Sequence, residues 1–226
     1  MHLFLTNFFN ISSLMPVQYL LWQGLRLTLL LSVVALPLAI LCGLSVALLY
    51  SFAGKRVRRF MLVLIDLMRA FPVLMMLILI YYSLPFLGIT LGGFSAVVAA
   101  IVLNNTGYFS EIFRAGLESI PVSQMEAAQA LGFHRTKAMF YIILPQVLRR
   151  AAAPLASNSL ELVKTTSIAG LVAIPELIRS AEIAQEQIYN PTPLSAVGII
   201  FFVLLWPFSH LVSRLERGAL LGRVDL

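Results

Sequence analysis

The amino-acid sequence predicts an all-α protein that crosses a membrane about five times. Of its 226 residues, 60% are hydrophobic and only 12% are charged, and the mean hydropathy is +0.92. A water-soluble protein of this length would need far more polar surface to cover its core. Several apolar runs reach the roughly 20 residues that a helix needs to cross a bilayer. None shows the alternation of a membrane β-barrel, so we expect one helical domain over residues 1–226.

Five apolar segments are long enough to span a bilayer, with boundaries defined to within several residues. They cover approximately residues 19–52, 60–84, 94–113, 151–174 and 194–215. The first is longer than a span requires, so we expect it to tilt or to extend beyond the membrane. Residues 1–16 lack the basic start and short apolar core of a cleavable signal, and we expect them to lie on the outer side.

The distribution of Lys and Arg predicts the orientation of these spans. Twelve basic residues follow the first, third and fifth spans: Lys55, Arg56, Arg58, Arg59, Arg114, Arg135, Lys137, Arg149, Arg150, Arg214, Arg217 and Arg223. The segments on the opposite side hold only Arg179. Cytoplasmic loops carry the excess of positive charge, so we expect the N-terminus outside and the C-terminus inside the cell. Because the charges gather at the ends of apolar runs, they indicate topology rather than nucleic-acid binding.

The longest polar interval, residues 114–150, begins with the pattern of a short helix. Ser123 and Glu126 have the spacing of a capping box, which predicts a helix start near Gln124. Gly132 can adopt the left-handed conformation that ends a helix. Taken singly, Glu126 could serve only as a cap and Gly132 only as a helix end.

The same interval predicts a second short helix and a surface for a partner. Thr136 is a plausible cap for the second helix, and Pro145 is expected to disturb the helix that follows. The first helix carries Ala127, Ala128 and Ala130, whose small side chains allow another backbone to approach closely. We therefore expect this helix to fit into a groove of another protein.

The spacing in this interval resembles the EAA loop of permease subunits from bacterial ABC importers. The matching residues, in order and without a gap, are Glu126, Ala127, Ala128, Gly132, Ile142, Leu144 and Pro145. In that family the loop is cytoplasmic, and its first helix docks into a cleft on the ATP-hydrolysing subunit. The resemblance implies that the coupling to ATP hydrolysis is carried by Glu126, Ala127, Ala128, Leu131 and Gly132.

The resemblance extends over most of the chain, roughly residues 19–215, and points to the polar amino-acid group of this family. It implies the type I permease fold and alternating access. It also implies two ATPase subunits, a second identical or related permease, an external solute-binding protein and a lipid environment. The chain has no Gly-x-x-x-x-Gly-Lys-[Ser/Thr] motif for nucleotide. We therefore expect neither an enzyme nor a cofactor, and an ATPase partner must supply the energy.

Two charged residues lie inside the second span, where ionisable groups are costly. Asp66 and Arg69 are three residues apart and could pair on one helix face. The run Arg69-Ala70-Phe71-Pro72 resembles the Arg-x-x-Pro signature of polar amino-acid permeases, although Phe71 departs from the small or branched residue usual there. We expect Arg69 to tie helices together near the cytoplasmic side.

The fourth span carries polar groups through an otherwise apolar helix. Asn158, Glu161 and Thr165 recur at a spacing that places them on one helix face, where they could line a cavity. Lys164 begins a run that resembles the Lys-[Asp/Thr]-Thr-Ser-Leu segment of the same amino-acid group. Two interpretations of Glu161 remain open: it neutralises Lys164, or it faces the pathway and binds a cationic part of the solute.

Asn104 and Asn105 lie within the third span and could either pack between helices or contact a zwitterionic solute. After the fourth span, residues 175–193 predict a partly amphipathic helix at the outer surface. This helix either lies free in solvent or contacts a solute-binding protein.

Two other classes of protein share some of these features. A proton-coupled secondary transporter of small polar solutes also buries ionisable groups, but it usually shows an internal repeat and more spans. A structural membrane subunit would lack the polar stripe of the fourth span. No nucleophile–base pair and no cluster of metal ligands is visible in the sequence, and Cys42 lies in an apolar run that predicts a packing role.

Overall fold

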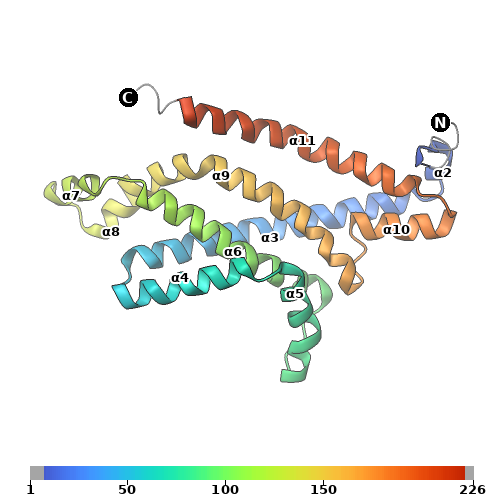
Figure 1. Cartoon of the computed structure of the whole chain (residues 1–226), viewed down its shortest axis with the longest axis horizontal. Helices are drawn as coiled ribbons and strands as arrows, with labels where there is room; N and C mark the ends of the chain where they lie inside the picture. The colour runs from blue at the N-terminus through green and yellow to red at the C-terminus, as the bar shows by residue number, and fades with distance from the viewer. Residues whose placement is uncertain (1–7, 222–226) are drawn as a thin grey trace. The chain divides into compact units, whose positions relative to one another are not determined.

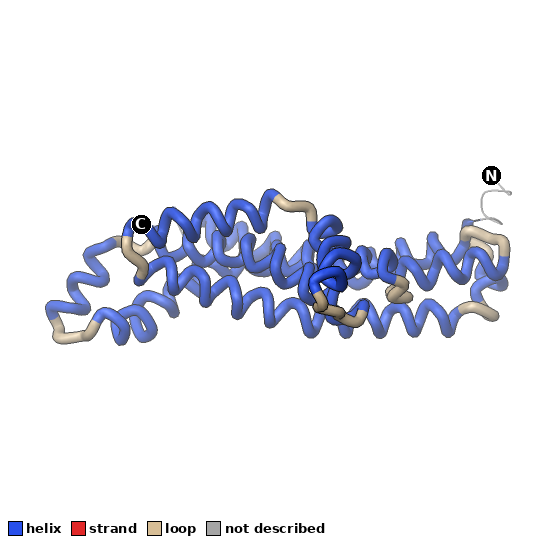
Figure 2. Tube along the Cα trace, turned by 90° about the horizontal axis from the view of Figure 1, so that it is seen from below, coloured by secondary structure: helices blue, strands red, loops and turns tan. Residues whose placement is uncertain are grey.

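The computed structural model describes the backbone of residues 8–221 and the side chains of residues 8–214. In this part of the chain all regular secondary structure is helical, and Figure 2 shows blue helices joined by short tan loops. The prediction of an all-α fold is confirmed. Residues 1–7, expected on the outer side, and Arg223 lie outside the described residues.

The helices follow one another with few intervening residues (Figure 1). In chain order they are α2 (Ile11–Leu14), α3 (Gln18–Phe52), α4 (Lys55–Ala70), α5 (Val73–Ile78), the π-helix η1 (Leu79–Ser83), the 3-10 helix η2 (Leu84–Leu87), α6 (Gly93–Glu118), α7 (Val122–Ala130), α8 (Arg135–Ala138), the π-helix η3 (Met139–Ile143), α9 (Leu144–Thr165), the 3-10 helix η4 (Thr166–Val172), α10 (Leu177–Ile188) and α11 (Thr192–Leu221).

Fewer helices meet the length and composition of a membrane span than the sequence predicted. Among the described residues these are α3, α6 and α11, with a fourth span if α4 and the helices from Val73 to Leu87 are counted as one broken span. The predicted span 60–84 is broken at Phe71 and Pro72. Pro72 cannot donate a backbone hydrogen bond, and Phe71 before it is extended, with ψ near 125°.

The predicted fourth span, residues 151–174, changes its helix type along its length. The chain is α-helical from Leu144 to Thr165 and continues as the 3-10 helix η4. The α9 helix does not qualify as a span by composition, because Arg149, Arg150 and the polar residues from Asn158 onward interrupt it. By this measure the expected five spans become three or four.

The chain forms two compact units whose segments alternate along the sequence. One contains the described residues up to Pro37 together with Val73–Ile101 and Leu160–His210, and the other contains Leu38–Pro72, Val102–Ser159 and the residues after His210. The first unit packs α10 against the beginnings of α3 and α11, through buried Leu21, Leu177, Ala181 and Val197. The predicted amphipathic helix is confirmed, because α10 buries residues at helical spacing.

The second unit is held together by close contact between α3 and α6. A Cβ atom added at Gly43 of α3 would lie 2.5 Å from Cβ of Phe109 and 2.9 Å from the backbone nitrogen of Ser110, both on α6. Only a glycine allows this approach. Phe109 and Phe113 of α6 are almost fully buried, so this contact positions the end of α6 from which the predicted coupling loop extends.

Candidate functional site

The helix α7 occupies the position predicted for the first helix of the loop, but it starts differently. It begins at Val122, and Pro121 precedes it without any side-chain cap. The predicted capping box is therefore wrong, since Ser123 lies inside the helix. The ring of Pro121 fixes φ near −57°, and its carbonyl accepts the N–H of Gln124 at 3.0 Å. These features set the helix start.

The end of α7 follows the prediction. Gly132 has φ +84°, in the left-handed region. The N–H of Phe133 donates to the carbonyl of Ala128 at 3.0 Å, and the N–H of Gly132 donates to that of Gln129 at 2.9 Å. This pair of bonds is a Schellman motif, which satisfies the last carbonyls of the helix. The prediction that Gly132 ends the helix is confirmed.

Most of the predicted coupling residues are accessible. Glu126, Ala127, Leu131 and Gly132 are exposed, and the side chain of Leu131 is 79% exposed. Ala128 is only 3% exposed. The prediction that Ala128 is presented outward is therefore wrong in this chain. Its small side chain lets α7 lie close to its neighbours, while the outer face carries the other four residues.

In the second part of the loop the structure contradicts the predicted cap and shows what form the disturbance near Pro145 takes. The helix α8 begins at Arg135 without a side-chain cap, so Thr136 does not cap it. The disturbance expected at Pro145 takes the form of a π-helix just before it, over Met139–Ile143, with the N–H of Leu144 donating to the carbonyl of Met139. This wider turn accommodates the proline, which lacks an N–H, in the first turn of α9.

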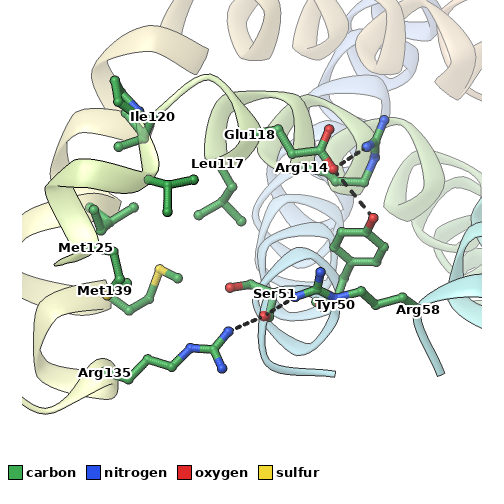
Figure 3. Close-up of a pocket in the computed structure, with 13 residues that line it drawn as sticks. Tyr50, Ser51, Arg58, Arg114, Leu117, Glu118, Ile120, Met125, Arg135 and Met139 are labelled. Atoms are coloured by element: carbon green, nitrogen blue, oxygen red, sulfur yellow. Dashed lines mark hydrogen bonds and ion pairs between the residues drawn. The ribbon is translucent and has the colours of Figure 1, made fainter. Parts of the chain in front are cut away.

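A cavity of about 260 Å³ lies behind α7, within the second unit (Figure 3). Arg114 joins its wall to the end of α6, with hydrogen bonds of 2.6 and 2.8 Å to Glu111 and 2.7 Å to Glu118. Tyr50 donates to Glu118 at 3.5 Å. The lining residues are Tyr50, Ser51, Arg58, Arg114, Leu117, Glu118, Ile120, Pro121, Val122, Met125, Arg135, Met139 and Ile143.

Asn104 of α6 forms hydrogen bonds to the backbone where the predicted second span is broken. The amide of Asn104 donates to the carbonyls of Met68 at 3.0 Å and Phe71 at 3.1 Å. Those carbonyls belong to the end of α4, where the helix has no further N–H groups to offer. Both amide hydrogens of Asn104 are therefore engaged, which favours the packing interpretation over contact with a solute.

Asp66 and Arg69 form a loose pair, with 3.7 Å between Oδ1 and Nη1, and the Asp66 side chain is 73% exposed. The Arg69 guanidinium also lies over the ring of Tyr108, 5.6 Å from its centroid. The hydroxyl of Tyr108 donates to the carbonyl of Arg69 at 3.2 Å. Arg69 thus joins α4 to α6, although its Nε is buried without a hydrogen-bond partner.

The polar residues of α9 make contacts within each unit. In the second unit the amide of Asn158 donates to Oδ1 of Asn105 at 3.2 Å. In the first unit Lys164 and Glu161 form an ion pair of 2.6 Å, with side chains 52% and 65% exposed. The hydroxyl of Thr165 donates to the carbonyl of Glu161 at 2.8 Å. The ion pair between Glu161 and Lys164, one of the two predicted alternatives, is thus present and accessible.

The sequence analysis did not identify the role of Glu176. Glu176 is 1% exposed and caps α10, accepting the N–H groups of Ile178 and Arg179 at 2.9 Å each. Burial raises the pKa of this carboxyl, against the opposing effect of the two backbone hydrogen bonds. The position directly before the helical pattern was the signal for a cap.

The comparisons with known proteins agree with this architecture. The family described as binding-protein-dependent transport system inner membrane component matches residues 35–220. The chain is 32% identical to the probable glutamine ABC transporter permease protein GlnP of Bacillus subtilis, covering 87% of this chain and 92% of that one. It is also 32% identical to the glutamine transport system permease protein GlnP of Escherichia coli K12, covering 92% and 97%.

A solved structure, the crystal structure of an amino acid ABC transporter with histidines, superposes with a TM-score of 0.81. It is 32% identical, and the match covers 92% of this chain and 98% of that chain. The chain therefore belongs to the family of binding-protein-dependent transport system inner membrane components, as a multi-pass permease subunit of an ABC importer that leaves ATP hydrolysis to a separate subunit.

Proposed function

We propose that this permease moves a polar amino acid across the bacterial inner membrane by alternating access, driven by ATPase subunits that dock on α7. Two ATPase subunits, a second permease, identical or related, and an external solute-binding protein complete the importer. One observation carries the proposal. Ala127 in the short helix α7 and Leu131 at its end are exposed, next to the Gly132 that terminates the helix. Val122, at the start of the same helix, is also 73% exposed, and large exposed apolar residues grouped on one short helix are typical of a surface that a partner covers.

The docking of α7 can be tested by co-purification. The Leu131 side chain should enter the partner, so Leu131→Asp should reduce the recovered ATPase at least tenfold relative to the wild-type chain. The matched control is Tyr141→Asp, which alters another large exposed side chain of the same loop, 75% exposed and outside α7. Equal recovery of the ATPase with both variants would contradict docking on α7.

The proposed orientation places the loop in the cytoplasm. In a variant without Cys42, a cysteine at Leu131 should react with a membrane-impermeant maleimide in inside-out vesicles and not in intact spheroplasts. A cysteine at Tyr189, which is 95% exposed after α10, should show the reverse pattern. Labelling of position 131 in spheroplasts would overturn the orientation.

We propose that the solute contacts the ion pair of Glu161 and Lys164. Ionisable groups at membrane depth usually face a water-filled cavity or another helix, and this pair remains more than half exposed in the single chain. Its carboxylate and ammonium complement the ammonium and carboxylate of a zwitterionic amino acid. Glutamine, the solute in the names of two relatives, is the first candidate.

The part of the solute that Glu161 contacts can be tested by comparing the uptake of neutral and cationic amino acids. If Glu161 binds a cationic side chain, Glu161→Gln should lower the uptake of arginine or lysine more than that of glutamine. If it binds the ammonium group common to all amino acids, uptake of all three should fall together. The control Lys164→Gln removes the other charge of the pair. Unchanged uptake in both variants, with normal insertion, would remove the pair from the pathway.

A further inference from the structure

A second contact of the loop connects it to the end of α3. Arg135, the first residue of α8, donates from Nη2 to the carbonyl of Ser51 at 2.9 Å. Its guanidinium also lies over the ring of Phe52, 5.3 Å from the ring centroid. Ser51 and Phe52 are the last two residues of α3. Figure 3 shows Arg135 reaching across the rim of the cavity to Ser51.

The end of α3 is a favourable place for a cation. The last carbonyls of a helix lack partners within the helix and carry the negative end of its dipole. A guanidinium that donates to such a carbonyl forms a charge-assisted hydrogen bond, about twice as strong as a neutral one. The contact with Phe52 adds a cation–π interaction. Arg135 therefore joins the loop to α3 through two interactions that reinforce each other.

A second arginine binds the same carbonyl from another element. Arg58 of α4 donates to the carbonyl of Tyr50 at 3.0 Å and to that of Ser51 at 2.8 Å. It lies only a few residues after α3, so it caps that helix locally and makes no link to the loop. Arg58 and Arg135 thus share an acceptor, but of these two only Arg135 belongs to the loop of residues 114–150.

The surroundings of α7 make this link mechanically important. The base of the loop is closed by Arg150, which donates to the carbonyl of Ser119 at 2.6 Å and to its hydroxyl at 3.1 Å. Above that base, α7 borders the cavity of about 260 Å³. Arg135 and Ser51 both line this cavity, and their hydrogen bond crosses its rim. Besides the backbone that joins α7 to α6 and α8, this bond gives a load on the loop a direct path to the end of α3.

We infer that Arg135 is a positioning residue that transmits movement of α7 and α8 to the end of α3. The inference rests on the proposed docking of the ATPase at α7 and adds the path by which the permease receives the movement. Arg135 need not contact the ATPase, the nucleotide or the solute. Its loss should separate hydrolysis from transport without removing the ATPase.

The test uses the complete importer reconstituted in lipid vesicles, with ATPase activity measured with and without the solute-loaded binding protein. In Arg135→Gln, the ATPase should co-purify in wild-type amounts and basal hydrolysis should stay within about twofold of wild type. Stimulation by the loaded binding protein should fall about tenfold, which corresponds to losing one hydrogen bond to a charged group. The control Arg58→Gln removes a bond to the same carbonyl and should keep its stimulation.

Arg135→Lys provides a graded variant that also serves if the glutamine variant does not assemble. Lysine keeps the charge but loses the planar contact with Phe52, so stimulation should lie between wild type and Arg135→Gln. Wild-type stimulation in either Arg135 variant would overturn the inference while leaving ATPase docking intact. An equal loss in Arg58→Gln would assign the effect to the capping of α3.

Two results would separate this inference from the proposed function. Loss of the ATPase on purification of Arg135→Gln would make Arg135 a docking contact and overturn the transmission role. Failure of the wild-type chain to co-purify with any ATPase would contradict the proposed function, and the inference would fall with it.

Discussion

The side-chain amide of Asn104 donates to the carbonyl of Phe71 across 3.1 Å, at the point where the second predicted span is broken. Pro72 stops α4, which leaves carbonyl groups without helical partners. The same amide reaches Met68 at 3.0 Å. Asn104 is only 8% exposed, so water cannot easily replace it. A polar residue inside an apolar helix thus satisfies the backbone of a neighbouring one.

Replacing Asn104 with leucine should destabilise the protein. The carbonyls of Met68 and Phe71 would lose their side-chain donor, at roughly 1–3 kcal/mol for each group left unsatisfied. For a protein of this size that corresponds to a fall in Tm of at least about 2–4 °C. The measurement is thermal unfolding of the purified protein in detergent. Leu103→Ala, at an exposed neighbouring position of α6, is the control and should change Tm less.

The cost of a substitution at Gly132 should depend on how well the new residue tolerates a positive φ. A Cβ at this position would meet no atom within 4 Å, so the effect is conformational rather than steric. Asparagine should be tolerated, alanine should cost about 1–2 kcal/mol locally, and valine should be worst. Solute-stimulated ATPase activity should follow the same order.

Gly54 supplies the control for this series. A methyl group added at Gly54 would also meet open space, but the φ of this residue is −73°. Gly54→Ala should therefore leave stimulation near the wild-type level. Full activity of Gly132→Val in a correctly inserted protein would contradict the role assigned to the end of α7.

The sequence predicted best those features that depend on a few neighbouring residues. Gly132 ends α7 as expected, because its preference for a positive φ is local. The start of the same helix was misjudged because Ser123 and Glu126 imitate a capping box while Pro121 sets the boundary. Local patterns thus gave the element but not always its first residue.

Features that depend on distant residues could not be read from the sequence. The partners of Asn104 are more than 30 positions away and exist only because Pro72 breaks α4. Ala128 belongs to the same triplet as the exposed Ala127, yet it faces inward. The contact between Arg135 and Ser51 joins residues that no periodic pattern relates.

Adding a methyl group at Gly43 should destabilise the packing of α3 on α6. The new Cβ would lie 2.5 Å from Cβ of Phe109 and 2.9 Å from the backbone nitrogen of Ser110, so the helices must separate. Overpacking of this kind costs typically about 1–3 kcal/mol. Gly198→Ala in α11 should instead raise the Tm, because a Cβ atom added there would meet nothing within 4 Å. Alanine is favoured over glycine in a helix by roughly 0.5–1 kcal/mol. A fall in Tm for both variants would contradict this account.

The buried cap Glu176 should make stability depend on pH. Burial raises the pKa of its carboxyl, with a smaller contribution from the charge of Glu182, so the fold favours the protonated form more than the unfolded chain does. This contribution to stability is complete below the unfolded pKa of about 4.3 and is lost as pH rises through the raised pKa of the folded state.

Lowering the pH from 7 towards 5 should therefore stabilise the wild-type protein through this group. In Glu176→Gln the group cannot titrate, and one amide oxygen replaces the two carboxylate oxygens that accept from Ile178 and Arg179. The change in Tm between pH 7 and pH 5 should thus be less positive in the variant than in wild type. Glu186→Gln, which alters another exposed carboxylate of the same helix, controls for surface charge. An identical pH response in wild type and Glu176→Gln would show that burial at the start of α10 does not perturb this carboxyl.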